Sequence, residues 1–101
     1  MFCVNVEIIK LITIYIIMKN ILMYTGPRCN FCDAAKRLLL RNNLKFKEID
    51  ISAKDGLREE MINKAQGRRT IPQIFFDDNH VGGYQELRAL EKSGELKNLI
   101  K

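Results

Sequence analysis

The stretch Thr25-Gly26-Pro27-Arg28-Cys29-Asn30-Phe31-Cys32 decides the fold of this chain, because a strand, a turn and a helix meet in it. The apolar run Ile21 to Tyr24 predicts a short buried strand, and Gly26-Pro27 marks a turn. From Asn30 to about Asn42 helix-forming residues dominate, so the turn leads into a helix. The apolar face of this helix carries Ala34, Ala35, Leu38 and Leu39.

Cys29 therefore lies where a strand gives way to the N-terminus of a helix. Unpaired N–H groups and the positive end of the helix dipole face a side chain at this position, and both favour its charged form. A thiol placed there becomes a thiolate at neutral pH. Cys32 lies one helical turn further along, on the same side and close enough to form a disulfide with Cys29. The spacing suits a reversible dithiol switch.

The composition is that of one soluble globular domain. The chain has 101 residues, of which 47% are hydrophobic and 29% are charged. Two of its three cysteines form the C-x-x-C motif, so they do not make the disulfide framework of a small secreted fold. We therefore expect a reducing, cytoplasmic location.

The formal net charge of +5 raises the question of nucleic-acid binding. The cations are spread along the chain, Arg68-Arg69 is the only pair of adjacent arginines, and no aromatic–basic interleaving occurs. We interpret the charge as a solvated basic surface that attracts anionic small molecules, and we predict no nucleic-acid partner.

Residues 1–18 form an apolar leader before the domain, which we assign to residues 19–101. The run Ile8 to Met18 is too short for a membrane span, and Lys10 and Thr13 interrupt it. We expect Met18 to be the biological start, so that residues 1–17 are a start-site extension; a weak anchor or export signal is the alternative. We assign no role to Cys3 and predict no membrane association.

Beyond the first helix, apolar spacing and turn residues predict the remaining elements. Strand–helix–strand order makes the first two strands parallel, and the later hairpin is antiparallel. The predicted fold class is α/β, with a four-stranded mixed sheet in the order β-α-β-α-β-β-α and helices on its faces. The segments are a strand over about 20–24, a helix to about 42–43, a strand over 45–51, a helix over 55–65, a strand over 73–76, a turn over 77–80, a strand over 81–82, a helix over 84–93 and a last helical turn over 95–101.

Four motifs carry a resemblance to a known family. Tyr24-Thr25, the Cys29-x-x-Cys32 pair, Thr70 to Phe75 and Gly82-Gly83 follow one another in the order and at the separations seen in glutaredoxins. The chain resembles this family, specifically its short bacterial dithiol members, over about Lys19 to Lys101. The resemblance implies a thioredoxin-like fold.

The resemblance also implies an activity, which is glutathione-dependent thiol–disulfide exchange. This activity would contribute to electron transport and to cell redox homeostasis. Cys29 matches the family's nucleophile and Cys32 its resolving thiol. The enzyme would reduce protein disulfides and protein–glutathione mixed disulfides, with glutathione as reductant and client proteins as partners, acting as a monomer. Pro72 matches a proline that is cis in the family.

Glutathione has two carboxylates, so its site needs cations or N–H donors at two ends. The Gly82-Gly83 pair allows close backbone approach, and the N–H groups of Tyr84 and Gln85 open a helix that can hold the γ-glutamyl carboxylate. Arg68 would meet the glycyl carboxylate, with Arg69 as a neighbouring candidate. The full set of predicted substrate-binding residues is Tyr24, Arg28, Arg68, Ile71, Pro72, Gly83, Tyr84 and Gln85.

The sequence departs from the family pattern in three ways. Asn30-Phe31 stand where the family commonly has Pro-Tyr, and Gly26 stands where many members carry a glutathione-binding lysine that Arg28 replaces in part. Gln85 stands where an aspartate that contacts the glutathione amino group is frequent, which leaves Glu86 as a substitute.

These departures keep two alternatives open. The loss of the proline is compatible with a carrier of a glutathione-coordinated [2Fe–2S] cluster, held between two protomers through Cys29. Gly26 and Gln85 are compatible with an enzyme served by thioredoxin reductase instead of glutathione. A structural zinc site would need two ligands besides the C-x-x-C pair, so we predict no metal site.

Some residues are assigned packing or surface roles. We interpret His80 as a polar turn residue, and the runs Phe75-Phe76 and Leu38 to Leu40 as core. For Tyr24 two roles stay open, core packing at the strand end and lining of the site beside the thiols.

Overall fold

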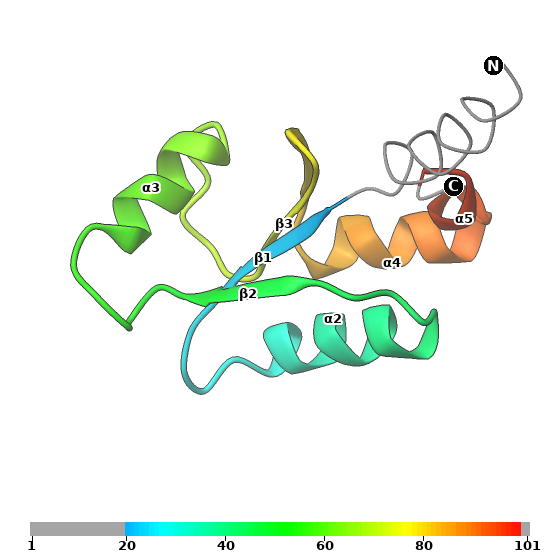
Figure 1. Ribbon diagram of the computed structural model, residues 1–101, viewed down its shortest axis with the longest axis horizontal. Helices are drawn as coiled ribbons and strands as arrows, with labels where there is room; N and C mark the ends of the chain where they lie inside the picture. The colour runs from blue at the N-terminus through cyan, green and yellow to red at the C-terminus, as the bar shows by residue number, and fades with distance from the viewer. Residues whose placement is uncertain (1–19, 100–101) are drawn as a thin grey trace, which may run out of the picture.

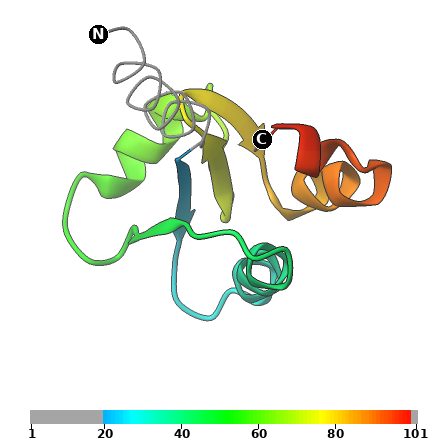
Figure 2. The same ribbon diagram turned by 45° about the vertical axis from the view of Figure 1, so that its right-hand side comes forward.

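A four-stranded mixed sheet lies at the centre of the molecule, with helices on both faces (Figures 1 and 2). The computed structural model describes residues 20–99. The strand order is β2-β1-β3-β4; β1 is parallel to β2 and antiparallel to β3, and β3 is antiparallel to β4. The predicted fold class is confirmed. The elements are β1 (Ile21–Thr25), α2 (Asn30–Arg41), β2 (Lys47–Asp50), α3 (Leu57–Lys64), β3 (Gln73–Phe76), β4 (Asn79–Gly82), α4 (Tyr84–Ser93) and α5 (Glu95–Leu99).

The predictions for the leader, residues 1–18 with Cys3, lie outside the described residues. Within residues 20–99, no helix combines the length and the apolar character that a membrane crossing requires.

The hairpin is tighter than predicted. β3 and α4 have the predicted bounds, but β4 begins at Asn79, so only Asp77 and Asp78 remain in the turn. Asp77 adopts a positive φ of 55°, which aspartate tolerates better than most residues and which reverses the chain within two residues. His80 therefore belongs to a strand, and its interpretation as a turn residue is wrong.

The sheet separates two apolar clusters. Alternate residues of a strand point to opposite faces, so Ile21 and Met23 of β1 pack against α2 and α4, while Tyr24 packs against α3. Figure 2 shows the same division, with α3 on one side of the sheet and α2 and α4 on the other. The larger cluster contains Ile21, Met23, Ala35, Leu38, Leu39, Ile74, Phe76, Leu87 and Leu96, and the smaller one Tyr24, Met61, Ala65 and Phe75.

The prediction that Leu38, Leu39 and Leu40 are all core residues is wrong for the last of them. Leu38 and Leu39 are fully buried, but Leu40 is 62% exposed. Three consecutive residues of a helix span about 200° of its circumference, so they cannot all face one sheet.

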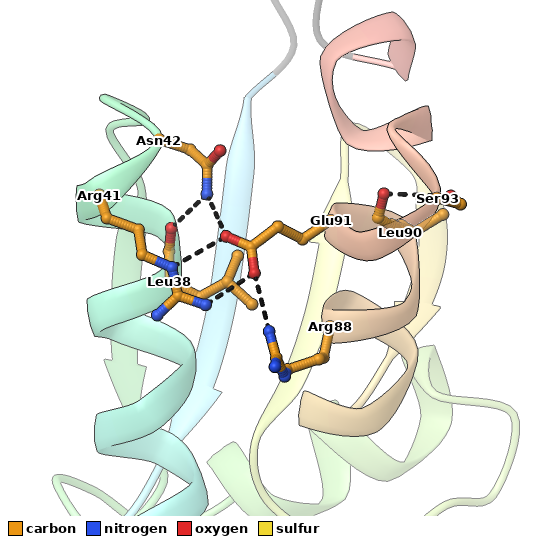
Figure 3. A network of polar contacts seen from close by, with 7 residues as sticks. All are labelled: Leu38, Arg41, Asn42, Arg88, Leu90, Glu91 and Ser93. Atoms are coloured by element: carbon orange, nitrogen blue, oxygen red, sulfur yellow. Dashed lines mark hydrogen bonds and ion pairs between the residues drawn. The ribbon is translucent and has the colours of Figure 1, made fainter.

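A polar cluster joins α2 to α4 at the end of α2 (Figure 3). The Glu91 carboxylate accepts hydrogen bonds from Nε and Nη2 of Arg41 at 2.9 and 2.7 Å, and from the Asn42 amide at 2.8 Å. Arg88, one turn earlier on α4, donates to it at 3.2 Å. The Arg41 guanidinium, more than the other donors, lowers the pKa of Glu91 to about 2. The two helices are thus held together by charge as well as by apolar packing.

Replacement of Glu91 by glutamine should destabilise the fold by about 1 kcal/mol at neutral pH, because two cations lose their carboxylate. A carboxyl group with a lowered folded pKa stabilises the fold above its unfolded pKa of about 4.3. This contribution disappears as the pH falls through the folded value of about 2. The difference between wild type and Glu91→Gln in urea unfolding should therefore shrink on acidification.

Glu59→Gln is the matched control, since it removes an exposed carboxylate on α3 and should change the unfolding free energy little. A Glu91→Gln effect that stays constant from neutral pH down to the acid limit would show that the carboxylate charge is not what joins the helices.

Candidate functional site

Cys29 is the last residue of the loop that connects β1 to α2. Its backbone is extended, with φ −115° and ψ 101°, and its Sγ accepts a hydrogen bond from the Cys32 N–H at 3.1 Å. Cys29 is thus the N-cap of α2, with its sulfur in place of the usual hydroxyl or carboxylate oxygen. The donors at the start of a helix favour negative charge on that sulfur when it is reduced. The position predicted for Cys29 is confirmed.

The loop before Cys29 is anchored at Thr25, the last residue of β1. The buried Thr25 hydroxyl donates to Glu48 of β2 at 2.7 Å, and Lys36 of α2 pairs with the same carboxylate at 2.6 Å. These two partners, Lys36 first, lower the pKa of Glu48. Sheet and helix are therefore tied together directly behind the thiols.

Cys29 and Cys32 form a disulfide with a Cα–Cα distance of 5.2 Å. The two sulfurs differ in their access to solvent, because Cys29 is half-buried and Cys32 is only 1% exposed. Cys32 is shielded by the body of the protein, so Cys29 is the cysteine of the pair that lies nearer to solvent.

The segment before β3 passes directly beside Cys29. The Ile71–Pro72 bond is cis, as expected from the resemblance. The Ile71 carbonyl oxygen lies 3.8 Å from the Cys29 sulfur. Pro72 itself is buried. Residues far apart in the sequence thus share one edge of the site.

A groove of about 220 Å³ opens next to these residues. Six of the eight predicted substrate-binding residues line it, and Phe31, Thr70 and Glu86 complete it. Phe31 is 56% exposed and stacks on Tyr84 with ring centroids 5.8 Å apart. Phe31 lies between the two cysteines in the sequence, and this position could have predicted that it belongs to the site. The lining residues are Phe31, Arg68, Thr70, Ile71, Pro72, Gly83, Tyr84, Gln85 and Glu86.

Two predicted residues do not line the groove. Tyr24 has no exposed surface; its ring meets Phe75 edge-on and its hydroxyl donates to Glu60 at 2.7 Å. Burial first, and then the Glu60 carboxylate, raise the pKa of Tyr24. Of the two roles considered for Tyr24, the structure gives it core packing. Arg28 is exposed in the loop before Cys29 and is not among the lining residues.

Arg68 and Glu86 meet at the mouth of the groove. Arg68 Nη1 lies 2.6 Å from Glu86 Oε1, and the Gly83 N–H donates to the same oxygen at 2.8 Å. The Gly83 N–H, followed by Arg68, lowers the pKa of Glu86. The other candidate cation, Arg69, is exposed.

The buried side-chain amide of Gln73 connects Thr70, which lines the groove, to His80 of the β3–β4 hairpin. The Gln73 side chain has no exposed surface, and its NH₂ group donates to Thr70 at the carbonyl, 3.0 Å, and the hydroxyl, 3.1 Å. Its oxygen lies 2.6 Å from His80 Nε2, which must therefore carry the proton. His80 also stacks on Phe75, and burial more than the Arg68 charge lowers the pKa of His80.

Gly26 leaves room that Ile71 uses. A Cβ at Gly26 would lie 2.7 Å from the Ile71 Cδ1 atom, closer than such contacts allow. The absence of a side chain at this position therefore lets Ile71 sit against the loop that carries Cys29. Among the described residues, no group of three or more His, Cys, Asp or Glu side chains is arranged to hold a metal ion.

Comparisons with known proteins agree with this architecture. The Glutaredoxin family model matches residues 21–81. Glutaredoxin 3 of Escherichia coli K12 is 44% identical over 84 residues, which are 83% of this chain and all of that protein. The solution structure of glutaredoxin from Brucella melitensis is 48% identical with a TM-score of 0.73, over 83% of this chain and 90% of that one. A further structure, described as "Metal Binding of Glutaredoxins", is 47% identical with a TM-score of 0.65, over 84% and 91% of the two chains.

Replacement of His80 by phenylalanine should destabilise the fold by about 1–3 kcal/mol, because it leaves the buried Gln73 oxygen without a donor. Because the phenyl ring keeps the stack on Phe75, the loss of unfolding free energy reports on the hydrogen bond alone. Unfolding in urea measures it, with Asp78→Asn in the neighbouring turn as control. An unchanged unfolding midpoint for His80→Phe would mean that the Gln73 amide is satisfied in another way.

Proposed function

This chain belongs to the glutaredoxin family and is a thiol–disulfide oxidoreductase, and on that premise we propose that Cys29 and Cys32 reduce protein disulfides and protein–glutathione mixed disulfides with glutathione as the reductant. The observation that carries the proposal is the disulfide between a half-buried and a buried cysteine next to a groove.

Exchange on a glutathionylated protein needs Cys29 alone. Its thiolate attacks the glutathione sulfur, a Cys29–glutathione disulfide forms, and the client leaves as a thiolate that takes up a proton. A second glutathione thiolate then attacks the glutathione sulfur of this intermediate. Oxidised glutathione is released and the Cys29 thiolate is restored, so the client sulfur is reduced to a thiol while the sulfur of the one incoming glutathione is oxidised into the new disulfide. In this scheme both reactants approach Cys29, the half-buried cysteine of the pair.

Exchange on a protein disulfide also needs Cys32. Attack by Cys29 gives a mixed disulfide with the client and releases the first client thiolate. Cys32 then attacks the Cys29 sulfur, which closes the intramolecular disulfide and releases the second client thiolate. Two glutathiones reopen the pair in two further exchanges. Burial of Cys32 suits this role, because it reacts only with the sulfur of its neighbour.

The groove supplies the contacts that a glutathione peptide requires. We propose that the N–H groups of Tyr84 and Gln85, at the start of α4, hold the γ-glutamyl carboxylate, and that Arg68 meets the glycyl carboxylate. The backbone of Ile71, next to Pro72 and near the Cys29 sulfur, pairs with the extended peptide. Gly83 keeps this part of the groove free of a side chain.

We further propose that the enzyme acts as a monomer on client proteins in the cytoplasm. The basis is chemical: a C-x-x-C switch served by glutathione needs a compartment in which thiols stay reduced.

Cys29→Ser should abolish all exchange, since it removes the nucleophile. Cys32→Ser should keep the reduction of glutathionylated protein and lose the reduction of protein disulfides, because only the second reaction uses the buried thiol. Both variants and wild type are compared on a glutathionylated protein and on a disulfide-bonded protein, with glutathione, glutathione reductase and NADPH.

Equal losses in the two variants would overturn the asymmetric roles. Activity restored by thioredoxin reductase, and absent with glutathione and its reductase, would assign the other electron source. Asp33→Asn, which changes an exposed residue of the first turn of α2, controls for disturbance of the helix.

A second candidate function is a [2Fe–2S] cluster carrier. It is favoured by Asn30 in place of the family's proline and by the similarity to the structure described as "Metal Binding of Glutaredoxins". The residues present fit only a shared cluster, because one sulfur per chain, Cys29, is accessible. Two protomers and two glutathione thiols would then complete the four ligands.

Anaerobic reconstitution with iron, sulfide and glutathione separates the two functions. The oxidoreductase alone should stay colourless and monomeric in size-exclusion chromatography. A brown dimer, with thiolate-ligated cluster absorbance that Cys29→Ser removes and Cys32→Ser retains, would establish the carrier. The dimer should disappear when glutathione is omitted.

A further inference from the structure

His80 is connected to the groove without lining it. It is half-buried on β4, and its Nε2 donates to the Gln73 side-chain oxygen at 2.6 Å. The Gln73 NH₂ group in turn donates to the carbonyl and the hydroxyl of Thr70, at 3.0 and 3.1 Å. Thr70 lines the groove, whereas His80 and Gln73 are not among the lining residues. Any effect of His80 on the groove must therefore pass through the buried amide.

The groove wall formed by Thr70, Ile71 and Pro72 is a loop. It lies between α3 and β3 and belongs to no helix or strand. Its position is therefore set by side-chain contacts, and the Gln73 amide supplies two of them. The same wall carries the Ile71 carbonyl oxygen, 3.8 Å from the Cys29 sulfur. A displacement of Thr70 would be passed to this carbonyl, which belongs to the next residue of the chain.

The opposite wall of the groove begins close to His80 on the same strand. The register between β3 and β4 shifts after His80, which makes Val81 the extra residue of a β-bulge. A bulge bends its strand, and β4 here leads through Gly83 into α4, where the other wall lies. The His80 ring is itself fixed by a stack on Phe75, with ring centroids 4.9 Å apart. The hydrogen bond from His80 to Gln73 thus joins the supports of the two walls.

The buried Gln73 amide makes this connection depend on the His80 donor. Its side chain has no exposed surface, so bulk water cannot replace a lost donor. An amide without the His80 N–H must turn to satisfy its oxygen, which takes its NH₂ group away from Thr70. We propose that His80 is a positioning residue for ligand binding, which acts through Gln73 to hold the Ile71 backbone where an extended glutathione peptide can pair with it. The proposal rests on the proposed function, because it concerns the same groove.

Loss of the His80 donor should weaken binding and leave the nucleophile unchanged. A loop that is in its binding-competent position for only part of the time lowers the apparent affinity by that fraction. One hydrogen bond changes such an equilibrium about three- to tenfold. The cap on the Cys29 sulfur is the Cys32 N–H, which belongs to α2 and not to the loop. Alkylation of Cys29 by iodoacetamide, a small reagent that needs no groove, therefore gives an independent readout.

Two substitutions of His80 separate its donor from its ring. His80→Phe keeps a ring and removes the donor, while His80→Gln places an amide NH₂ near the former Nε2 and removes the ring. In NMR titrations of the reduced protein, His80→Phe should bind S-methylglutathione about three- to tenfold more weakly than wild type, and His80→Gln should bind it like wild type. Both variants should alkylate at Cys29 at the wild-type rate, followed by mass spectrometry. Glu91→Gln controls for lost stability, because it should destabilise the fold about two turns further along α4 and bind the probe like wild type.

Wild-type affinity in His80→Phe would overturn the proposal. Equal weakening in both His80 variants would assign the effect to the ring, and weakening in Glu91→Gln would assign it to lost stability. Either result also overturns the proposal, as does alkylation that slows in step with binding. If wild type itself does not bind S-methylglutathione, the glutathione function fails and the positioning role fails with it. If wild type binds and His80→Phe binds equally well, only the positioning role fails.

Discussion

The hydrogen bond from the Cys32 N–H to the Cys29 sulfur is the contact on which the site depends. An N-cap must satisfy donors that the helix itself leaves unpaired, and here the capping atom is the sulfur that we propose as the nucleophile. The start of α2 and the reactivity of the thiol are therefore set by one interaction. The start of α2 is held in place because Ala35, Leu38 and Leu39 pack the helix against the sheet.

The opposite edge of the site depends on a second constraint, the buried amide of Gln73. A fully buried amide must find partners for its NH₂ and its oxygen, and it finds them in Thr70 and His80. That requirement ties the segment containing Ile71 to the hairpin, and so places its carbonyl near the Cys29 sulfur. The requirement that a buried amide be hydrogen-bonded thus helps to place residues that are distant in the sequence on the two sides of one site.

Periodicity and turn residues were enough to predict the order of the elements, the bounds of β3 and α4, and the place of Cys29. They could not predict which helix or strand packs against each face of an element. Tyr24 follows the strand alternation, but only the position of α3 and Glu60 decides that its hydroxyl is buried. His80 is polar and near a turn, yet a buried amide across the hairpin draws it into β4. The Arg68–Glu86 pair, 18 residues apart, needs the tertiary fold to exist.

The electrostatics of the groove follow from these contacts and not from the net charge. The chain carries a formal charge of +5, but the cation that lines the groove is neutralised by Glu86. At a Debye length of about 8 Å in physiological salt, exposed cations elsewhere contribute to encounter more than to the bound state. In the proposed function, selection of the ligand comes from directed donors, the N–H groups that begin α4 and the guanidinium of Arg68. Directed donors discriminate by geometry, because a hydrogen bond weakens steeply when donor and acceptor are misaligned.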